Sequence, residues 1–330
     1  MPRRRPRLAP PPVTAIDDLV TIRDWLRFAV SRFTAADLAY GHGTSRALDE
    51  AAFIILATLN LPIDELAPWL DARLARDERA LLLDIIEKRI ATRKPAAYLL
   101  GEAWIGGHRF SVDERVIVPR SFIGELLVRD GLAAVVADPG RVRSVLDLCT
   151  GSGCLAILAA SAFPEARIDA VDISPAALDV AAANVAEHGL SDRIRLVCGD
   201  LFAGLDEAVY DLVLSNPPYV TAAAVAAFPP EYRAEPVIAH LGGKDGLDIV
   251  RRILAEAPRH LAPSGAIVVE VGDARAAVES AYPGLPFLWL DTEESEGEVF
   301  ALQADDLAPK SRRTSAAAGS TAVGRKKRGG

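Results

Sequence analysis

Sulfur-containing residues are scarce in this chain, which has three cysteines and one methionine among 330 residues. Cys149, Cys154 and Cys198 lack the spacing of a metal site, so we expect reduced thiols and no metal ion. Uninterrupted apolar stretches of membrane-spanning length are also missing, and the Arg- and Pro-rich start lacks the apolar core of a signal peptide. These absences predict a cytoplasmic protein that makes no membrane contact.

Charge is unevenly spread along the chain, whose net charge is −8. Residues 1–12 hold four arginines and no acid, and residues 310–330 hold seven basic residues and no acid. Eleven of the 37 basic residues therefore lie in the ends, and the body between them carries 26 basic against 45 acidic residues. We expect 1–12 and 306–330 to be disordered. Their composition favours solvated extensions, with weak contact to RNA as the alternative.

The first part of the chain, 13–94, has a helical pattern of apolar residues and is predicted to be a small helical domain that recognises the substrate. Its first apolar stripe consists of Leu19, Ile22, Leu26, Val30 and Phe33. A connecting segment, 95–120, follows. The alternation of Val112, Val116 and Val118 predicts short strands there, in the form of a hairpin.

Strands and helices alternate regularly over the remaining residues, 121–305. The expected strands are 144–148, 167–171, 194–198, 210–215 and 266–271, with helices at 154–162, 175–188 and 248–261. An antiparallel pair, 287–290 and 298–302, completes the series. The predicted fold class is α/β, a doubly wound, mostly parallel, Rossmann-like sheet of seven strands with an antiparallel edge hairpin, preceded by the helical domain.

The motif Asn216-Pro217-Pro218-Tyr219 directly follows the apolar run 210–215. Two prolines cannot continue a central strand, so the chain must kink at the strand's carboxyl end, where open α/β sheets bind ligands. The Asn216 side-chain oxygen and the Pro217 carbonyl could each accept one hydrogen of a planar amino group, with Tyr219 along its plane. The alternative is an ordinary surface turn.

Three further strand ends carry residues suited to a nucleoside cofactor. Gly151 and Gly153 permit a tight turn after the first strand, Asp172 suits the two hydroxyls of a ribose, and Asp200 with Leu201 suits an adenine. The stretch 151–156 also satisfies the dinucleotide pattern GxGxxA, so NAD is an alternative cofactor. S-adenosyl-L-methionine accounts for all four strand ends together, including the amine clamp, and methyl transfer is therefore the preferred chemistry.

Longer segments give a family resemblance over nearly the whole body. They are Ser31-Arg32-Phe33, Tyr40-Gly41-His42-Gly43-Thr44, the stretch from Val112 to Ser121, Gly124-Glu125-Leu126, the stretch from Asp147 to Cys154, the stretch from Ala170 to Pro175, and the stretch from Glu231 to Pro236. With these segments the chain resembles the HemK/PrmC-like glutamine-N(5) methyltransferases, whose NPPY holds the glutamine amide. Within them it is similar to the branch that modifies large-subunit ribosomal protein three (the PrmB type), because Cys149 replaces the glycine typical of the release-factor branch.

The resemblance implies an S-adenosylmethionine-dependent protein-glutamine N-methyltransferase whose partner is a large-subunit ribosomal protein, free or in an assembling particle. The implied cofactor residues are Cys149, Thr150, Gly151, Ser152, Gly153, Asp172, Asp200, Leu201 and Asn216, and the implied substrate clamp is Asn216, Pro217, Pro218 and Tyr219. An adenine-N6 nucleic-acid methyltransferase remains an alternative, because NPPY specifies an amino group and not its bearer. A non-catalytic ribosome-assembly factor is the third.

Other charged residues have two open interpretations each. Arg120 and Glu125 precede the sheet and could border the cofactor or form a structural ion pair. Glu231, Arg233 and Glu235 follow the NPPY motif, where substrate contact and a solvated loop are equally good interpretations.

Overall fold

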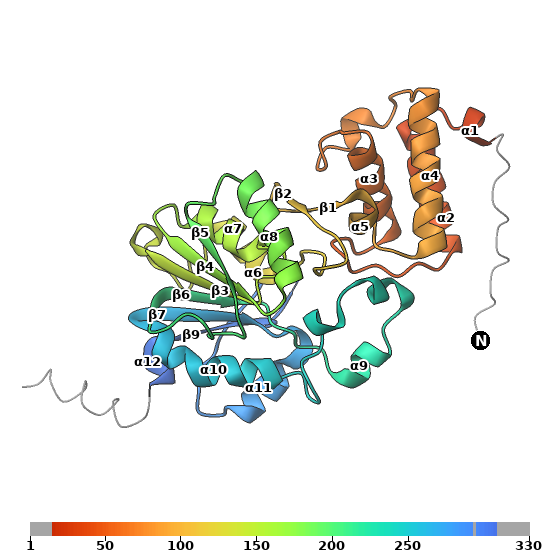
Figure 1. Cartoon of the computed structure of the whole chain (residues 1–330). Helices are drawn as coiled ribbons and strands as arrows, with labels where there is room; N and C mark the ends of the chain where they lie inside the picture. The colour runs from red at the N-terminus through yellow and green to blue at the C-terminus, as the bar shows by residue number, and fades with distance from the viewer. Residues whose placement is uncertain (1–14, 293–294, 309–330) are drawn as a thin grey trace, which may run out of the picture.

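The computed structural model describes residues 15–292 and 295–308. A helical domain begins the described chain, a short hairpin follows, and a large α/β domain completes it (Figure 1). The expected disorder of 1–12, and of the tail beyond residue 308, lies outside the described residues. Within the described ranges, no helix combines the length and the apolar character that crossing a membrane requires.

The helical domain is built from amphipathic helices that bury one face in a shared core. Its elements are α1 (Ala15–Asp18), α2 (Ile22–Ala35), α3 (Ala47–Thr58), the 3-10 helix η1 (Ala67–Trp69) and α4 (Arg76–Thr92). Thr21 caps α2, since its hydroxyl accepts from the Asp24 N–H and the Asp24 carboxylate accepts from the Thr21 N–H. The buried stripe of α2 includes Trp25, Phe28 and Ala29, so the predicted stripe needs correction: Leu26 and Val30 are only partly buried, and Leu19 precedes the helix.

The connecting segment contains α5 (Ala96–Leu100) and an antiparallel hairpin of β1 (Glu102–Ile105) and β2 (His108–Ser111). The hairpin therefore precedes the stretch 112–118, where we predicted it. Val112, Val116 and Val118 are buried against the α/β core without pairing as a strand, which explains why their apolar pattern resembled one. The true hairpin turns at Gly106 and Gly107, both with positive φ, as a two-residue turn between strands requires.

The α/β domain is a seven-stranded sheet in the order β5-β4-β3-β6-β7-β9-β8. Its strands are β3 (Ser144–Leu148), β4 (Arg167–Asp172), β5 (Ile194–Cys198), β6 (Tyr210–Ser215), β7 (Leu261–Glu270), β8 (Leu288–Leu290) and β9 (Val299–Gln303). The first five are parallel, and β9 runs antiparallel to both β7 and β8, so the predicted fold class is confirmed. β7 begins five residues earlier than predicted, with a register shift opposite the start of β6.

Helices cover both faces of the sheet (Figure 1). From residue 122 on, the helices are α6 (Phe122–Asp130), α7 (Cys154–Ala162), α8 (Pro175–Glu187), α9 (Ala222–Ala226), α10 (Asp248–His260), α11 (Arg275–Ala281) and α12 (Ala304–Leu307), with 3-10 helices η2 (Pro139–Arg141), η3 (Pro230–Ala234), η4 (Val237–Ala239) and η5 (Gly272–Ala274). Of these, α9 lies in a loop away from the sheet (Figure 1). Residues 306 and 307 belong to α12, so the tail begins later than the predicted residue 306.

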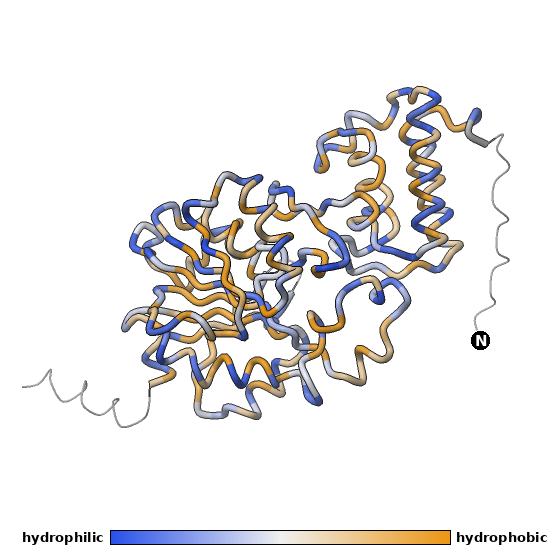
Figure 2. Tube along the Cα trace, viewed as in Figure 1, coloured by the Kyte–Doolittle hydropathy of each residue, from blue (hydrophilic) through white to orange (hydrophobic). Residues whose placement is uncertain are grey.

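Alternate residues of each central strand enter two different cores. In β6, Leu212 and Leu214 pack with α6, α7 and α8, whereas Val213 packs with α10 and α11. The central strands are mostly apolar on both sides, and orange, the hydrophobic colour, predominates along the sheet in Figure 2. Because both faces are covered, only the strand ends are open to a ligand.

Candidate functional site

The carboxyl ends of β3, β4, β5 and β6 meet at one edge of the sheet, because the four strands are parallel neighbours. A cavity of about 200 Å³ lies there, and we call it the first cavity. It is lined by six predicted cofactor residues: Cys149, Gly151, Asp172, Asp200, Leu201 and Asn216. Apolar side chains, among them Val116, Ile117 and Ile249, supply other walls, so a few polar groups line a largely apolar space.

Asp147, whose role the sequence did not reveal, holds the loop after β3 through hydrogen bonds. Its side chain is fully buried, and Oδ2 accepts from the Thr150 hydroxyl at 2.5 Å and from the Ala156 N–H at 3.0 Å. Burial raises the pKa of Asp147 to about 7. Its Oδ1 has no hydrogen-bond partner among the described residues. Asp147 therefore shapes the loop and does not reach the cavity.

The other predicted loop residues support the turn without lining the cavity. Thr150 donates to Asp147, and the Ser152 carbonyl accepts from the Asn184 amide at 2.9 Å. Gly153 has φ +80° at the start of α7, and a Cβ there would lie 3.3 Å from the Cβ of Ala181. These three residues are thus placed beside the cavity and not at its surface.

Asp172 ends β4 with both carboxylate oxygens engaged by the backbone. Oδ2 accepts from the Gly151 N–H at 2.9 Å and Oδ1 from the Ser174 N–H at 2.9 Å. Burial raises the pKa of Asp172, against the opposing effect of these two N–H groups. The carboxylate couples the loop after β3 to the end of β4, and it faces the first cavity.

Asp200 and Leu201 follow β5 and line the same cavity. Arg252 of α10, which the sequence did not single out, lies there too and pairs with Asp200 at 2.9 Å between Nη2 and Oδ2. The preceding Gly199 has no room for a side chain, because a Cβ would lie 2.2 Å from the Ala203 carbonyl oxygen. The tight turn therefore presents Asp200 beside the apolar side chain of Leu201.

The NPPY residues cross from the first cavity to a second one of about 220 Å³. Pro218 lines the first cavity, Pro217 and Tyr219 line the second, and Asn216 lines both. Over the described part of the chain, neither the Asn216 side chain nor the Pro217 carbonyl has a hydrogen-bond partner. The structure therefore presents two unengaged acceptors at the junction of two cavities.

The loop after the NPPY motif forms the far wall of the second cavity with Phe228, Tyr232 and His240. Its backbone returns to the motif, since the Val220 N–H donates to the His240 carbonyl at 2.8 Å. Tyr232 reaches the helical domain, where its hydroxyl donates to the Tyr40 carbonyl at 3.4 Å. Gly41 makes this approach possible, because a Cβ there would lie 2.4 Å from the Tyr232 hydroxyl oxygen.

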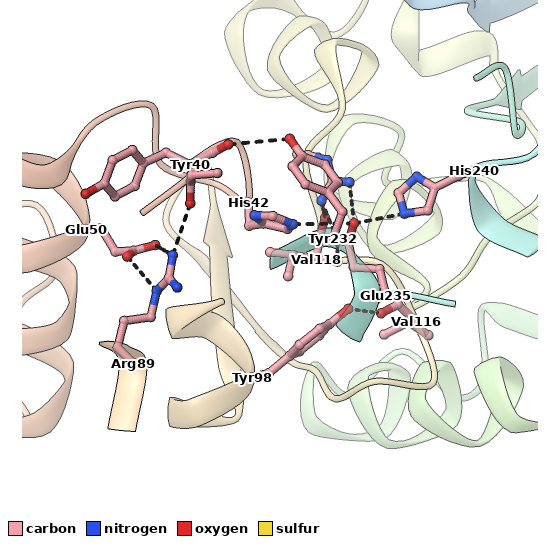
Figure 3. A network of polar contacts seen from close by, with 12 residues as sticks. Tyr40, His42, Glu50, Arg89, Tyr98, Val116, Val118, Tyr232, Glu235 and His240 are labelled. Carbon is pink, nitrogen blue, oxygen red and sulfur yellow. Dashed lines mark hydrogen bonds and ion pairs between the residues drawn. The ribbon is translucent and has the colours of Figure 1, made fainter. Parts of the chain in front are cut away.

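Glu235 is the centre of a buried polar network that joins this loop to the rest of the protein (Figure 3). Its carboxylate accepts from the Arg120 guanidinium at 2.6 and 2.8 Å and from the Val118 N–H at 3.0 Å. His240 lies 3.0 Å away and His42 of the helical domain 3.6 Å away. Burial alone would raise the pKa of Glu235, but Arg120 and His240 outweigh it and hold that pKa far below its usual range.

The charged residues with two open interpretations are now placed. Glu235 and Glu231 are buried, so the solvated-loop interpretation is wrong for both, whereas Arg233 is exposed. Glu231 accepts from the Ala39 N–H at 3.0 Å and pairs with Arg93, both in or beside the helical domain. Arg120 forms a structural ion pair, but its partner is Glu235 and not Glu125. Neither Arg120 nor Glu125 lines the first cavity.

One prediction concerns cofactor binding. The substitution Asp172→Asn puts an amide N–H₂ against one of the two backbone N–H donors and removes a charge. We therefore expect the Kd for the predicted cofactor, S-adenosylmethionine, to rise about 10- to 100-fold. This rise corresponds to about 1.5–3 kcal/mol, the contribution of a charged hydrogen bond. Isothermal titration calorimetry measures this. Asp169→Asn on the same strand is the control, because Asp169 pairs with Arg195 away from the cavity. An unchanged Kd in Asp172→Asn would remove this residue from the cofactor site.

The chain is similar to curated proteins over most of its length. It is 56% identical over 295 residues to a protein of Bradyrhizobium diazoefficiens, covering 88% of this chain and 92% of that one. It is 55% identical to a protein of Bordetella pertussis (88% and 97% covered) and 56% identical to one of Burkholderia pseudomallei (87% and 95% covered). All three carry the name "Ribosomal protein uL3 glutamine methyltransferase". The family model "Methyltransferase small domain" matches residues 130–228.

Proposed function

The chain belongs to the family of ribosomal protein uL3 glutamine methyltransferases, and from this premise we propose that it transfers a methyl group from S-adenosylmethionine to the side-chain amide nitrogen of a glutamine in uL3, the large-subunit ribosomal protein three. The reaction would take place in the cytoplasm, where ribosomal proteins are made and assembled. The chain is an enzyme of the methyltransferase class.

The first cavity fits S-adenosylmethionine. Cys149 and Gly151 would contact its amino-acid part, Asp172 its ribose, and Asp200 with Leu201 its adenine. Thr150, Ser152 and Gly153 would act by holding the loop in shape. The bound cofactor supplies a methyl group activated by a positively charged sulfur. The mostly apolar walls of the first cavity would reduce the hydration of this sulfur.

The single observation that carries the proposal is the position of Asn216 in both cavities. The Asn216 side-chain oxygen and the Pro217 carbonyl oxygen would accept the two amide hydrogens of the glutamine, and the Tyr219 ring would lie beside them. An amide nitrogen is a poor nucleophile because its lone pair is delocalised. Fixing both hydrogens orients the nitrogen toward the first cavity, and orientation of this kind supplies a large part of a barrier reduction.

No general base is required for this transfer. The amide proton would become acidic only as the nitrogen takes up the methyl group and the sulfur of the cofactor leaves as a neutral thioether. The proton would then leave to water. The residues of the second cavity act by holding and shielding the amide.

Incubation with methyl-labelled S-adenosylmethionine tests the proposal when purified uL3, an assembling large-subunit particle and ribosomal RNA are offered separately. We expect label on a glutamine side chain of uL3, located by mass spectrometry, and none on RNA. Label on adenine would replace the proposal with an adenine-N6 methyltransferase, and no label in any arm would favour a non-catalytic assembly factor. Comparison of the first two arms shows whether free uL3 or the particle is modified.

A further inference from the structure

Tyr219 separates the second cavity from a larger groove. This groove has a volume of about 650 Å³ and runs between the helical domain and the α/β domain. Residues that line it include Gly43, Asp49, Trp104, Glu125, Tyr219 and Glu270. Tyr219 and Arg120 line both spaces, so the orientation of the Tyr219 ring forms part of the wall between them.

Glu270 contacts the Tyr219 hydroxyl from the carboxyl end of β7. Its side chain is buried, with the residue only 1% exposed. Oε2 accepts from the Ser121 hydroxyl at 2.7 Å and from the Phe122 N–H at 2.9 Å, which fixes the carboxyl group against the start of α6. Oε1 accepts from the Tyr219 hydroxyl at 3.3 Å. One oxygen is thus anchored to the fold, and the other is directed to the tyrosine.

Gly272 lies against the face of the Tyr219 ring. A Cβ at this position would lie 2.6 Å from Cε2 and 3.1 Å from Cδ2 of Tyr219, so the ring packs directly on the glycine backbone. Gly272 also has φ +51°, which few residues with a side chain adopt. The ring is therefore limited by a backbone surface on one side and by a hydrogen bond at its tip.

We propose that Glu270 and Gly272 are positioning residues for the methyl transfer: together they hold the Tyr219 ring in the plane that the glutamine amide needs beside Asn216. This inference rests on the proposed function for its effect on catalysis. Glu270 does not touch the reacting atoms and acts through the tyrosine. The sequence carried a signal for it, since an acidic residue ends an apolar strand at Glu270 as it does at Asp172.

Kinetic measurements distinguish two roles of Glu270: positioning of Tyr219, and a purely structural contact with Ser121 and Phe122 at the start of α6. Tyr219→Phe removes the hydroxyl and leaves the contacts of Glu270 with Ser121 and Phe122 intact. We expect kcat to fall about tenfold in Tyr219→Phe and in Glu270→Gln, with the Kd for S-adenosylmethionine unchanged, because small misplacements of positioned groups cost turnover. The double variant should be no slower than the slower single variant. Multiplied effects in the double variant would mean that Glu270 does not act through Tyr219, and would overturn the proposal.

A second readout does not depend on activity. In protein labelled with ¹³Cζ-tyrosine, the resonance of Tyr219 among the six tyrosines is assigned by its loss in Tyr219→Phe. We expect Glu270→Gln and Gly272→Ala to shift this resonance, and Glu125→Gln to leave it unchanged, because Glu125 lines the same groove without a contact to the hydroxyl. An unshifted resonance in Glu270→Gln would overturn the positioning. If the wild-type protein fails to methylate uL3, only the proposed function fails, since the resonance arm is measured without substrate.

Discussion

Asn216→Ala is expected to lower kcat for uL3 methylation by about 10² to 10³, with the Kd for S-adenosylmethionine raised by no more than about threefold. The loss of turnover is of the size found when one preorganised hydrogen-bonding group is removed from a reacting centre. Alanine removes the side-chain oxygen that would hold the amide and leaves the loop after β3, Asp172 and Asp200 in place around the cofactor. Stopped-flow single-turnover assays and calorimetry measure the two quantities separately.

Ser215→Ala is the matched control for this experiment. Ser215 precedes Asn216, but its hydroxyl donates to the Leu148 carbonyl at 3.0 Å inside the sheet and lines neither cavity. Its removal should change kcat less than about threefold. If Asn216→Ala weakened cofactor binding as much as turnover, Asn216 would belong to the cofactor site alone. That result would contradict the proposal that Asn216 holds the glutamine amide.

Local pattern was enough to predict the strand ends that build the first cavity. The bounds of β3, α7, β5 and β6 agree with the prediction, because these segments are mostly apolar and stop at polar or turn-forming residues. The residues just past those ends could therefore be named in advance. The hairpin was misplaced because hydrophobic alternation was weighed above the Gly106-Gly107 turn.

The burial of Glu231 and Glu235 depends on partners that are distant in the sequence, and local patterns could not predict it. Glu235 and Glu231 stand in a charged stretch that has the composition of an exposed loop, yet both are buried. The partner of Glu235, Arg120, lies 115 residues away, and the Ala39 N–H that contacts Glu231 lies 192 residues away. No local pattern reports a pairing over such a separation. His42 is also far from Glu235 in the sequence, and it belongs to the same buried network.

The loop after the NPPY motif contacts both the helical domain and the connecting segment. Glu231 and Tyr232 bind backbone groups beside the helical domain, and Glu235 binds the connecting segment. The same loop supplies walls of both cavities. The helical domain is therefore connected to the reaction site through this loop, and its role in substrate recognition stays a prediction.

Glu235→Ala is the variant with the largest expected loss of stability. It leaves the Arg120 guanidinium without its carboxylate partner and removes the acceptor of the Val118 N–H, and breaking one partner of a buried ion pair costs about 3–5 kcal/mol. Because Arg120 and His240 both line the second cavity, KM for uL3 should rise more than the Kd for S-adenosylmethionine. Urea unfolding and steady-state kinetics measure the two effects.

The stability difference between wild type and Glu235→Gln should also depend on pH in a defined direction. The folded protein holds the pKa of Glu235 below its usual value of 4.5, so the carboxylate contributes stability above that pH and loses it as the pH falls toward the folded-state pKa. The difference in free energy of unfolding is thus expected to be greatest near pH 7 and to shrink below about pH 4.5. Glu165→Gln is the control, since its exposed pair with Arg143 should contribute about 0.5 kcal/mol or less. A difference that grew on acidification would mean that folding does not favour the charged form of Glu235, and the ion pair would not be what holds the loop.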